Sequence, residues 1–246
     1  MFTVAERVRV RDALVELARE DRRITGAAIT GSGAVGREDE WSDVDLALCL
    51  APDADTDEVV AEWTRVLYER CAAVHHVDVV SGHTLFRVFL LASTLQVDVA
   101  FWPADEFGPT APTFRLLFGT ANERPRPTAP DAADLVGMTW LYALHARSSI
   151  ERGRGWQAEY MISGVRDHVL ALQCLRHGVP TAQGRGIDQV PDEVTAPVAD
   201  TLVSSLEPAE LRRAFRAAVD ALLAEARLVD PGLAARLHDP LRELAG

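Results

Sequence analysis

Two segments of the sequence place carboxylates beside strand-like apolar residues. The first, residues 42–50, reads SDVDLALCL. Side chains alternate between the two faces of a strand, so Asp43 and Asp45 are expected on one face and the apolar residues on the other. Two carboxylates that share a face repel each other, and a folded protein keeps such a pair at low cost only if a cation neutralises it. This pair is therefore a candidate metal site.

The second segment, residues 95–101, reads LQVDVAF and has the same construction around Asp98. If the two segments form neighbouring strands, which lie about 4.8 Å apart, three carboxylates converge. Oxygen ligands of this kind suit Mg²⁺, which takes its remaining ligands from water and phosphate oxygens. Two such ions about 3.5–4 Å apart can stabilise both the attacking and the leaving oxygen of an in-line displacement.

The residues that lead into the first segment offer groups that can bind phosphate. Gly31 and Ser32 follow a β-branched run, residues 24–30, and a turn there can bring backbone N–H groups close to phosphate oxygens. Ser42 can donate to the same phosphates, and Arg37 can add a bidentate contact. Every basic residue of the chain apart from histidine is arginine, so a P-loop lysine is excluded.

The order and spacing of these residues resemble a known superfamily. Gly31-Ser32, ten intervening residues, Asp43-Val44-Asp45-Leu46 and the later Asp98 resemble the signature of the DNA polymerase β-type nucleotidyltransferases. With a helical C-terminal half, the chain further resembles bacterial antibiotic nucleotidyltransferases, which adenylylate aminoglycosides or lincosamides. The motif covers about the first hundred residues.

The resemblance implies an activity and a role for each residue of the motif. Gly31, Ser32 and Ser42 would hold a nucleoside triphosphate, and the three aspartates would hold Mg²⁺. The donor would be ATP, and AMP would pass to a hydroxyl of a small acceptor. All three acidic positions are filled, which argues against an inactive copy.

The general base that takes the acceptor's proton has two candidates, Asp98 and Glu159. Asp98 belongs to the metal cluster. In the antibiotic-modifying relatives a glutamate of the helical half can act as base, and Glu159 occupies the matching stretch. On a helix Glu159, Ser163 and Arg166 share a face, so an ordinary salt bridge from Glu159 to Arg166 or Arg152 is the alternative role.

Composition limits the partners. The net charge of −12 disfavours a broad nucleic-acid track and suits a cationic acceptor. The three scattered cysteines lack C-x-x-C spacing and indicate buried thiols in a reducing compartment. No apolar stretch is long enough to span a membrane, and the N-terminus has no signal-peptide core, so the expected location is the cytoplasm.

The elements that would position these groups change character along the chain. A helix is predicted over residues 3–22 and another over 56–71, and strands over 24–30, 43–50, 74–80, 85–91 and 95–102. Residues 122–131 concentrate proline and polar residues, as a linker would. Beyond them, helices are predicted over 134–152, 156–177, 191–205 and 208–227, with a short one at the end.

The prediction is an α+β protein of two domains. Residues 1–124 would form a nucleotidyltransferase catalytic domain, a mixed sheet with flanking helices. Residues 125–246 would form a helical acceptor-binding domain. The sequence leaves two alternative functions, a regulatory partner protein and an enzyme of nucleic acid. An antitoxin-type regulatory partner usually lacks a long helical half, and nucleic-acid tailing or repair is disfavoured by the charge.

Overall fold

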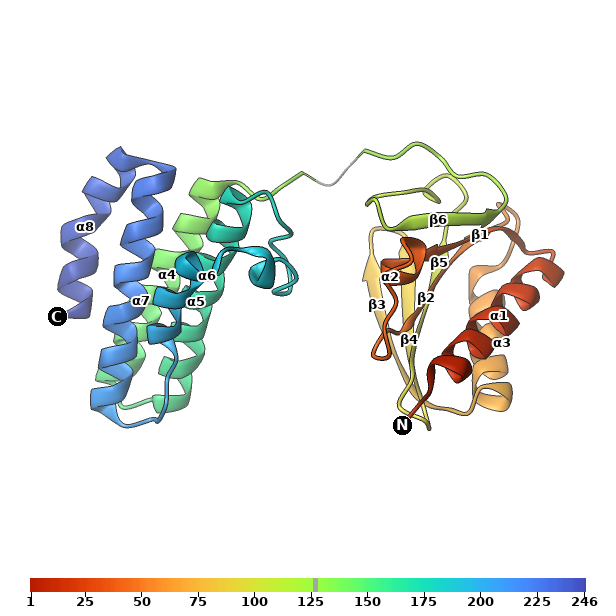
Figure 1. Ribbon diagram of the computed structural model, residues 1–246, viewed down its shortest axis with the longest axis horizontal. Helices are drawn as coiled ribbons and strands as arrows, with labels where there is room; N and C mark the ends of the chain where they lie inside the picture. The colour runs from red at the N-terminus through yellow and green to blue at the C-terminus, as the bar shows by residue number, and fades with distance from the viewer. Residues whose placement is uncertain (126–127) are drawn as a thin grey trace. The chain divides into compact units, whose positions relative to one another are not determined.

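The computed structural model describes residues 1–125 and 128–246. The chain divides into two compact units, Met1–Pro127 and Thr128–Gly246, and each is described by itself (Figure 1). The predicted linker, residues 122–131, includes residues 126 and 127, which lie outside the described part.

The first unit is a six-stranded sheet with helices. Its elements in chain order are α1 (Val4–Glu20), β1 (Ile24–Thr30), α2 (Gly31–Ala34), β2 (Val44–Leu50), α3 (Thr56–Arg70), β3 (Ala73–Ser81), β4 (Thr84–Leu91), β5 (Gln96–Trp102) and β6 (Phe114–Phe118). The strand order across the sheet is β3-β4-β5-β2-β1-β6.

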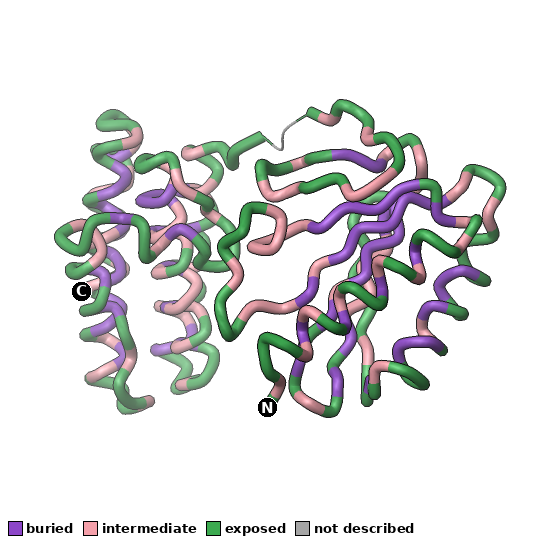
Figure 2. The backbone as a smooth tube through the Cα atoms, turned by 45° about the vertical axis from the view of Figure 1, so that its right-hand side comes forward, coloured by how far each residue is buried: buried purple, intermediate pink, exposed green. Residues whose placement is uncertain are grey.

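One face of this sheet is covered by α1 and α3 (Figure 1). Alternate residues of β2, namely Val44, Leu46, Leu48 and Leu50, are buried against these helices, as the alternating pattern predicts. Trp63 of α3 is 1% exposed and anchors this core. The opposite face carries a smaller apolar cluster that includes Ala47, Ala100 and Trp102. Figure 2 shows the buried backbone running through the central strands.

The pairing of β2 with β5 is parallel, whereas the other strand pairs of the sheet are antiparallel. Two parallel neighbours begin at the same edge of a sheet. The N-terminal residues of β2 and of β5 therefore lie side by side, although they are far apart in the sequence.

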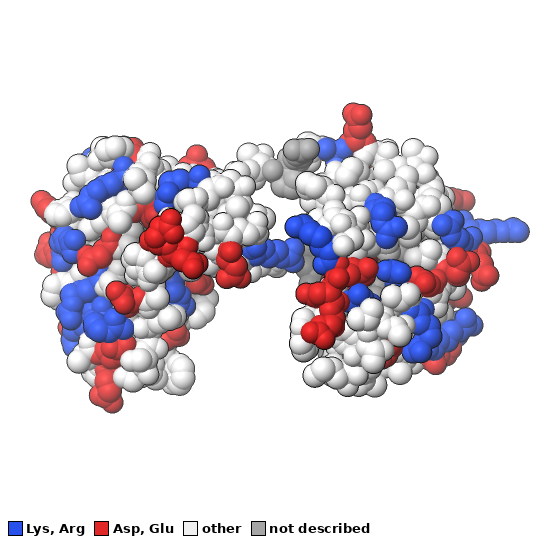
Figure 3. All heavy atoms as spheres, in the orientation of Figure 1, with Lys and Arg blue, Asp and Glu red and all other residues white. Residues whose placement is uncertain are grey.

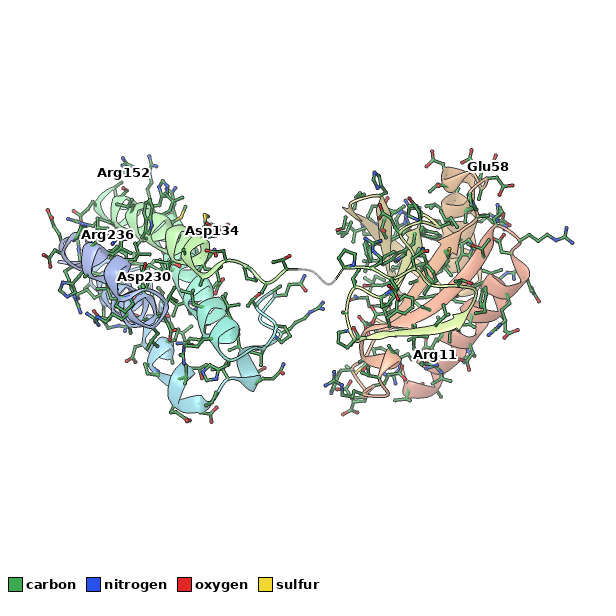
Figure 4. All side chains as sticks on the ribbon, turned by 90° about the horizontal axis from the view of Figure 1, so that it is seen from above. Arg11, Glu58, Asp134, Arg152, Asp230 and Arg236 are labelled. Carbon is green, nitrogen blue, oxygen red and sulfur yellow. The ribbon has the colours of Figure 1, made fainter. Side chains whose placement is uncertain are left out.

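The second unit is helical. Its elements are α4 (Ala132–Glu151), α5 (Gly155–Arg176), η1 (Ile187–Gln189), α6 (Asp192–Thr195), η2 (Ala196–Thr201), α7 (Pro208–Val229) and α8 (Pro231–Ala245). Asp134 and Arg152 mark the two ends of α4 in Figure 4. Apolar residues of α4, α5, α7 and α8 form one core. Glu225 is buried in it and pairs with Arg176 at 3.1 Å, which satisfies its charge.

The predicted fold class, a mixed sheet with flanking helices followed by a helical part, is confirmed. One predicted helix, 191–205, is wrong. The structure has the short α6 and then a 3₁₀ segment there, because Pro197 lacks the N–H that a helix needs and clashes with the preceding turn. The strand β6 was not predicted, and the terminal helix α8 is longer than expected, with 15 residues.

Acidic and basic side chains are interspersed on the visible face of each unit (Figure 3). Within residues 1–125 and 128–246, no helix is both long enough and apolar enough to traverse a lipid bilayer.

Candidate metal centre

Three carboxylates meet on the face of the sheet that α1 and α3 leave open. Asp43 directly precedes β2, Asp45 is the second residue of β2, and Asp98 is the third residue of β5. One oxygen of each lies within 4.8 Å of the others, and all three residues are half-buried. Asp45 and Asp98 are direct register partners across the parallel pair. The sheet thus brings together the three aspartates that the sequence singles out.

Alternation along the two strands decides which face the carboxylates occupy. Val44 and Leu46 flank Asp45 and are buried in the core under α1 and α3. Val97 and Val99 flank Asp98 and are buried in the same core. Burial of these neighbours fixes the strand rotation, and the aspartates must then project from the opposite face.

Gln96 joins the cluster, and sequence reasoning missed it. Its Nε2 donates to Asp43 Oδ2 at 3.2 Å and to Asp98 Oδ1 at 3.0 Å. The signal was present in the sequence, because Gln96 and Asp98 are two apart on one strand and so share a face. Gln96 offsets part of the repulsion between the two carboxylates.

Burial and a neighbouring carboxylate determine the electrostatics of Asp98. Burial is the main cause that raises the pKa of Asp98, and the negative charge of Asp43 raises it further, while the hydrogen bond from Gln96 opposes the shift. A positive ion removes the cost of both causes. Carboxylate oxygens at this spacing can hold a hard divalent cation.

The turn between β1 and β2 packs directly on the cluster. Gly31 begins α2 with φ of +61°, a conformation that favours glycine. A Cβ built on Gly31 would lie 2.0 Å from Asp45 Oδ2, so no other residue fits without displacing that carboxylate. The glycine of the Gly-Ser pair is therefore required by contact as well as by backbone conformation.

The two serines expected to bind phosphate also lie together. Their hydroxyl oxygens, Ser32 Oγ and Ser42 Oγ, are 3.4 Å apart. Ser42 donates to Asp39 Oδ1 and accepts from the Asp39 N–H, both at 2.9 Å. The side chain of Arg37 is exposed, and its backbone N–H donates to the carbonyl of Ser32 at 3.1 Å. These contacts fold residues 32–42 into one loop beside Asp43.

Two arginines of α1, Arg7 and Arg11, bind this loop, a role that the sequence did not indicate. Arg7 is 3% exposed, and its guanidinium donates to the carbonyls of Asp39 and, at 3.2 Å, of Ser42. Arg11 pairs with Glu38 at 3.2 Å. A buried arginine with several acceptors fixes the backbone that carries Ser42.

Glu159, the other candidate base, belongs to the second unit. It lies half-buried on α5 and accepts a hydrogen bond from Ser163 at 2.7 Å. The alternative salt bridge from Glu159 to Arg166 or Arg152 is not formed, and Arg166 pairs with the adjacent Asp167 at 3.7 Å. The neighbouring aromatics Trp156 and Tyr160 are 77% and 64% exposed, so they are not core residues.

Comparison with known proteins finds similarity among solved structures. No protein-family model matches the chain, and no curated protein matches it. Among solved structures, the chain is similar to an aminoglycoside 6-adenyltransferase from Bacillus subtilis, with 12% identity over 95% of this chain and 96% of that one and a TM-score of 0.40. The resemblance is remote and at the level of the fold.

Proposed function

We propose that the chain is a Mg²⁺-dependent nucleotidyltransferase that moves AMP from ATP onto a hydroxyl of a small molecule. One observation carries the proposal. Three carboxylates from two strands share a face within 4.8 Å of one another, beside a Gly-Ser turn that packs on one of them. Asp43, Asp45 and Asp98 would hold the metal, and Ser32, Ser42 and Arg37 would bind the triphosphate.

The chemistry is an in-line displacement. The acceptor oxygen forms a bond to the α-phosphorus, the bond from that phosphorus to the pyrophosphate oxygen breaks, and the hydroxyl proton passes to a carboxylate. Mg²⁺ bound at the cluster supplies charge that stabilises the phosphoryl oxygens as they become more negative. Ser32 and Ser42 would donate hydrogen bonds to the phosphates, and either Asp98 or Glu159 would receive the proton.

The acceptor we propose is an antibiotic of the aminoglycoside or lincosamide type. An acidic protein attracts cations, and the net charge of −12 favours an acceptor that carries amino groups. Exposed Trp156 and Tyr160 beside Glu159 offer aromatic faces and a carboxylate for such a molecule.

The test is transfer of label from α-labelled ATP. The full chain is incubated with labelled ATP, Mg²⁺ and a panel of aminoglycosides and lincosamides, and labelled adducts are separated by chromatography. We expect an adduct with at least one member, and loss of it with a chelator. Asp45→Asn and Asp98→Asn should each lower the rate at least about 100-fold, the usual effect of removing one group that stabilises transition-state charge.

Asp53→Asn is the matched control, because Asp53 is an exposed aspartate outside the cluster. It should leave the rate unchanged. Transfer by the Asp98→Asn variant at the wild-type rate would contradict the proposal. So would the absence of ATP binding in the presence of Mg²⁺, measured by calorimetry.

A further inference from the structure

The open face of the sheet also carries a cavity of about 510 Å³, which lies within the first unit. Its walls come from the β3–β4 hairpin, the ends of β1 and β5, the start of β6 and residues 106–113. A volume of this size is typical of small-molecule sites, which run from about 300 to 1,000 Å³. The three aspartates do not line this cavity, and the chemistry of its own lining residues indicates what it binds.

The cavity and the carboxylate cluster lie on the same face of the sheet. Thr30 lines it and directly precedes Gly31. Phe86 lines it from β4, opposite Ala100, which is two residues beyond Asp98 on the same face. At about 3.3 Å per residue, Ala100 lies about 7 Å from Asp98 along the strand. A nucleoside whose α-phosphate is held at the cluster extends over a distance of this order.

The walls are aromatic. Phe86, Trp102 and Phe114 line the cavity, and the first two rings meet edge to face with centroids 6.3 Å apart. Aromatic side chains bind bases of any identity by stacking on their faces. The indole N–H of Trp102 is buried and has no hydrogen-bond partner among the described residues. A buried donor without a partner is a feature of sites that a ligand or water completes.

The charges of the cavity disfavour a cationic occupant. Its carboxylate, Glu106, accepts from His83 Nδ1 at 2.6 Å and lies 3.6 Å from Arg124 Nη1. His83 is the main cause that lowers the pKa of Glu106, and Arg124 adds to it. The Arg124 guanidinium also stacks over the Trp102 ring, 5.4 Å from its centroid. The negative charge is thus already compensated, so an ammonium group gains little here, while a neutral planar heterocycle meets aromatic faces.

We infer that this cavity holds the nucleobase of the donor triphosphate, with Phe86 and Phe114 as its stacking walls. The inference rests on the proposed function, because it takes the triphosphate to lie at the cluster. Phe86 and Phe114 would then determine how tightly the donor binds without contacting the reacting atoms.

Two ligands distinguish binding of the nucleobase from binding of the phosphates. The full chain is titrated by calorimetry with Mg²⁺ and α,β-methylene ATP, and separately with Mg²⁺ and inorganic tripolyphosphate. In Phe86→Leu, which keeps an apolar side chain but removes the ring, we expect the Kd of the ATP analogue to rise at least fivefold. The Kd of tripolyphosphate should change less than twofold. Phe114→Leu tests the β6 side of the cavity in the same way if Phe86→Leu does not fold.

Val77→Ala is the matched control. Val77 lies on neighbouring β3, is 56% exposed and does not line the cavity. It should alter neither Kd. Folding of each variant is checked by its thermal midpoint.

Three results would overturn the inference. If Phe86→Leu and Phe114→Leu bind both probes as the wild type does, the base lies elsewhere and the proposed function survives. If they bind the ATP analogue normally but bind an aminoglycoside, titrated as a third ligand, more weakly, the cavity belongs to the acceptor. If the wild type binds neither probe with Mg²⁺, the proposed function itself fails.

Discussion

Asp45 and Asp98 face each other as register partners across the parallel pair of β2 and β5. Like charges directly opposite each other destabilise a sheet. The third carboxylate, Asp43, adds to the repulsion and is one cause of the raised pKa of Asp98, after burial. The protein therefore carries a local cost at neutral pH that a bound cation would remove.

Mg²⁺ should stabilise the first unit. Binding at 100 times the Kd adds about 2.7 kcal/mol to the free energy of unfolding. Each 1 kcal/mol raises the melting temperature by about 4–8 °C for 60–100 residues and by about 2–4 °C for 150–250 residues, and the first unit, Met1–Pro127, lies between these sizes. We expect the melting transition of the first unit to rise by several degrees in millimolar Mg²⁺, measured by scanning calorimetry.

Asp98→Asn separates metal binding from repulsion. The raised pKa means that the folded state binds a proton at Asp98 more tightly than the unfolded chain does, so this contribution to stability is lost as the pH rises through the raised pKa. Asparagine has no charge to neutralise. The metal-free variant should therefore be at least as stable as the metal-free wild type at pH 7, and Mg²⁺ should no longer raise its melting temperature. A normal rise in the variant would rule out Asp98 as a ligand.

The contact of Gly31 with Asp45 can be tested against a glycine of the same loop. A Cβ at Gly31 would meet Asp45 Oδ2 at 2.0 Å, whereas Gly36, with φ of +66°, has nothing within 4 Å of its Cβ position. Both Gly31→Ala and Gly36→Ala pay the left-handed backbone penalty of about 1–2 kcal/mol. Only Gly31→Ala displaces a carboxylate, so only it should weaken Mg²⁺ binding, by about tenfold or more, the scale of effect seen when a metal ligand loses its positioning contacts. Equal Mg²⁺ affinities of the two variants in calorimetry would show that the contact does not matter.

If Glu159 is the general base, its replacement should lower kcat without changing the Kd for ATP. Glu159→Gln keeps the acceptor for the Ser163 hydroxyl, which lies 2.7 Å away, but cannot take a proton. Loss of a general base lowers turnover by about 100- to 10,000-fold. We expect this loss in kcat with an unchanged Kd for ATP. Asp167→Asn, an exposed carboxylate on the same helix, should keep its kcat. Turnover near normal in Glu159→Gln would leave Asp98 as the base.

Asp21 gives the fold a pH dependence of its own. Its carboxylate accepts from Arg23 at 2.8 Å and from the indole of buried Trp63 at 3.1 Å. The hydrogen bond from Arg23 is the main cause that lowers the pKa of Asp21 in the folded state. The resulting stability is present above the unfolded pKa, about 3.9, and is lost as the pH falls through the lowered folded value.

Asp21→Asn should therefore cost about 1–3 kcal/mol at pH 7, the usual value of charge-assisted hydrogen bonds. The difference from the wild type should shrink as the pH falls below about 4, the region where an unfolded aspartate takes up its proton. Urea unfolding at pH 7 and at pH 3 measures this. Asp53→Asn, a change at an exposed position, should have little effect at either pH. A difference for Asp21→Asn that is constant with pH would mean that its charge is irrelevant to stability.

Most of the helices and strands, and the face on which each acidic residue lies, follow from local sequence patterns. The alternation around Asp45 and Asp98 is a local property, and it correctly predicted that Val44 and Val97 are buried. Periodicity likewise predicted the long helices α4, α5 and α7. Periodicity gave a wrong prediction over 191–205, because Pro197 interrupts a helix despite the apolar spacing around it.

Whether the three carboxylates meet depends on how the strands pair in the tertiary structure. The residues around Asp45 and Asp98 would alternate in the same way if β2 and β5 were antiparallel, but the two aspartates would then lie near opposite ends of the pair. Arg7 beneath the loop and Gln96 between two carboxylates are likewise long-range contacts. Local sequence encodes which face a side chain occupies, whereas strand direction and register follow from how the whole core packs.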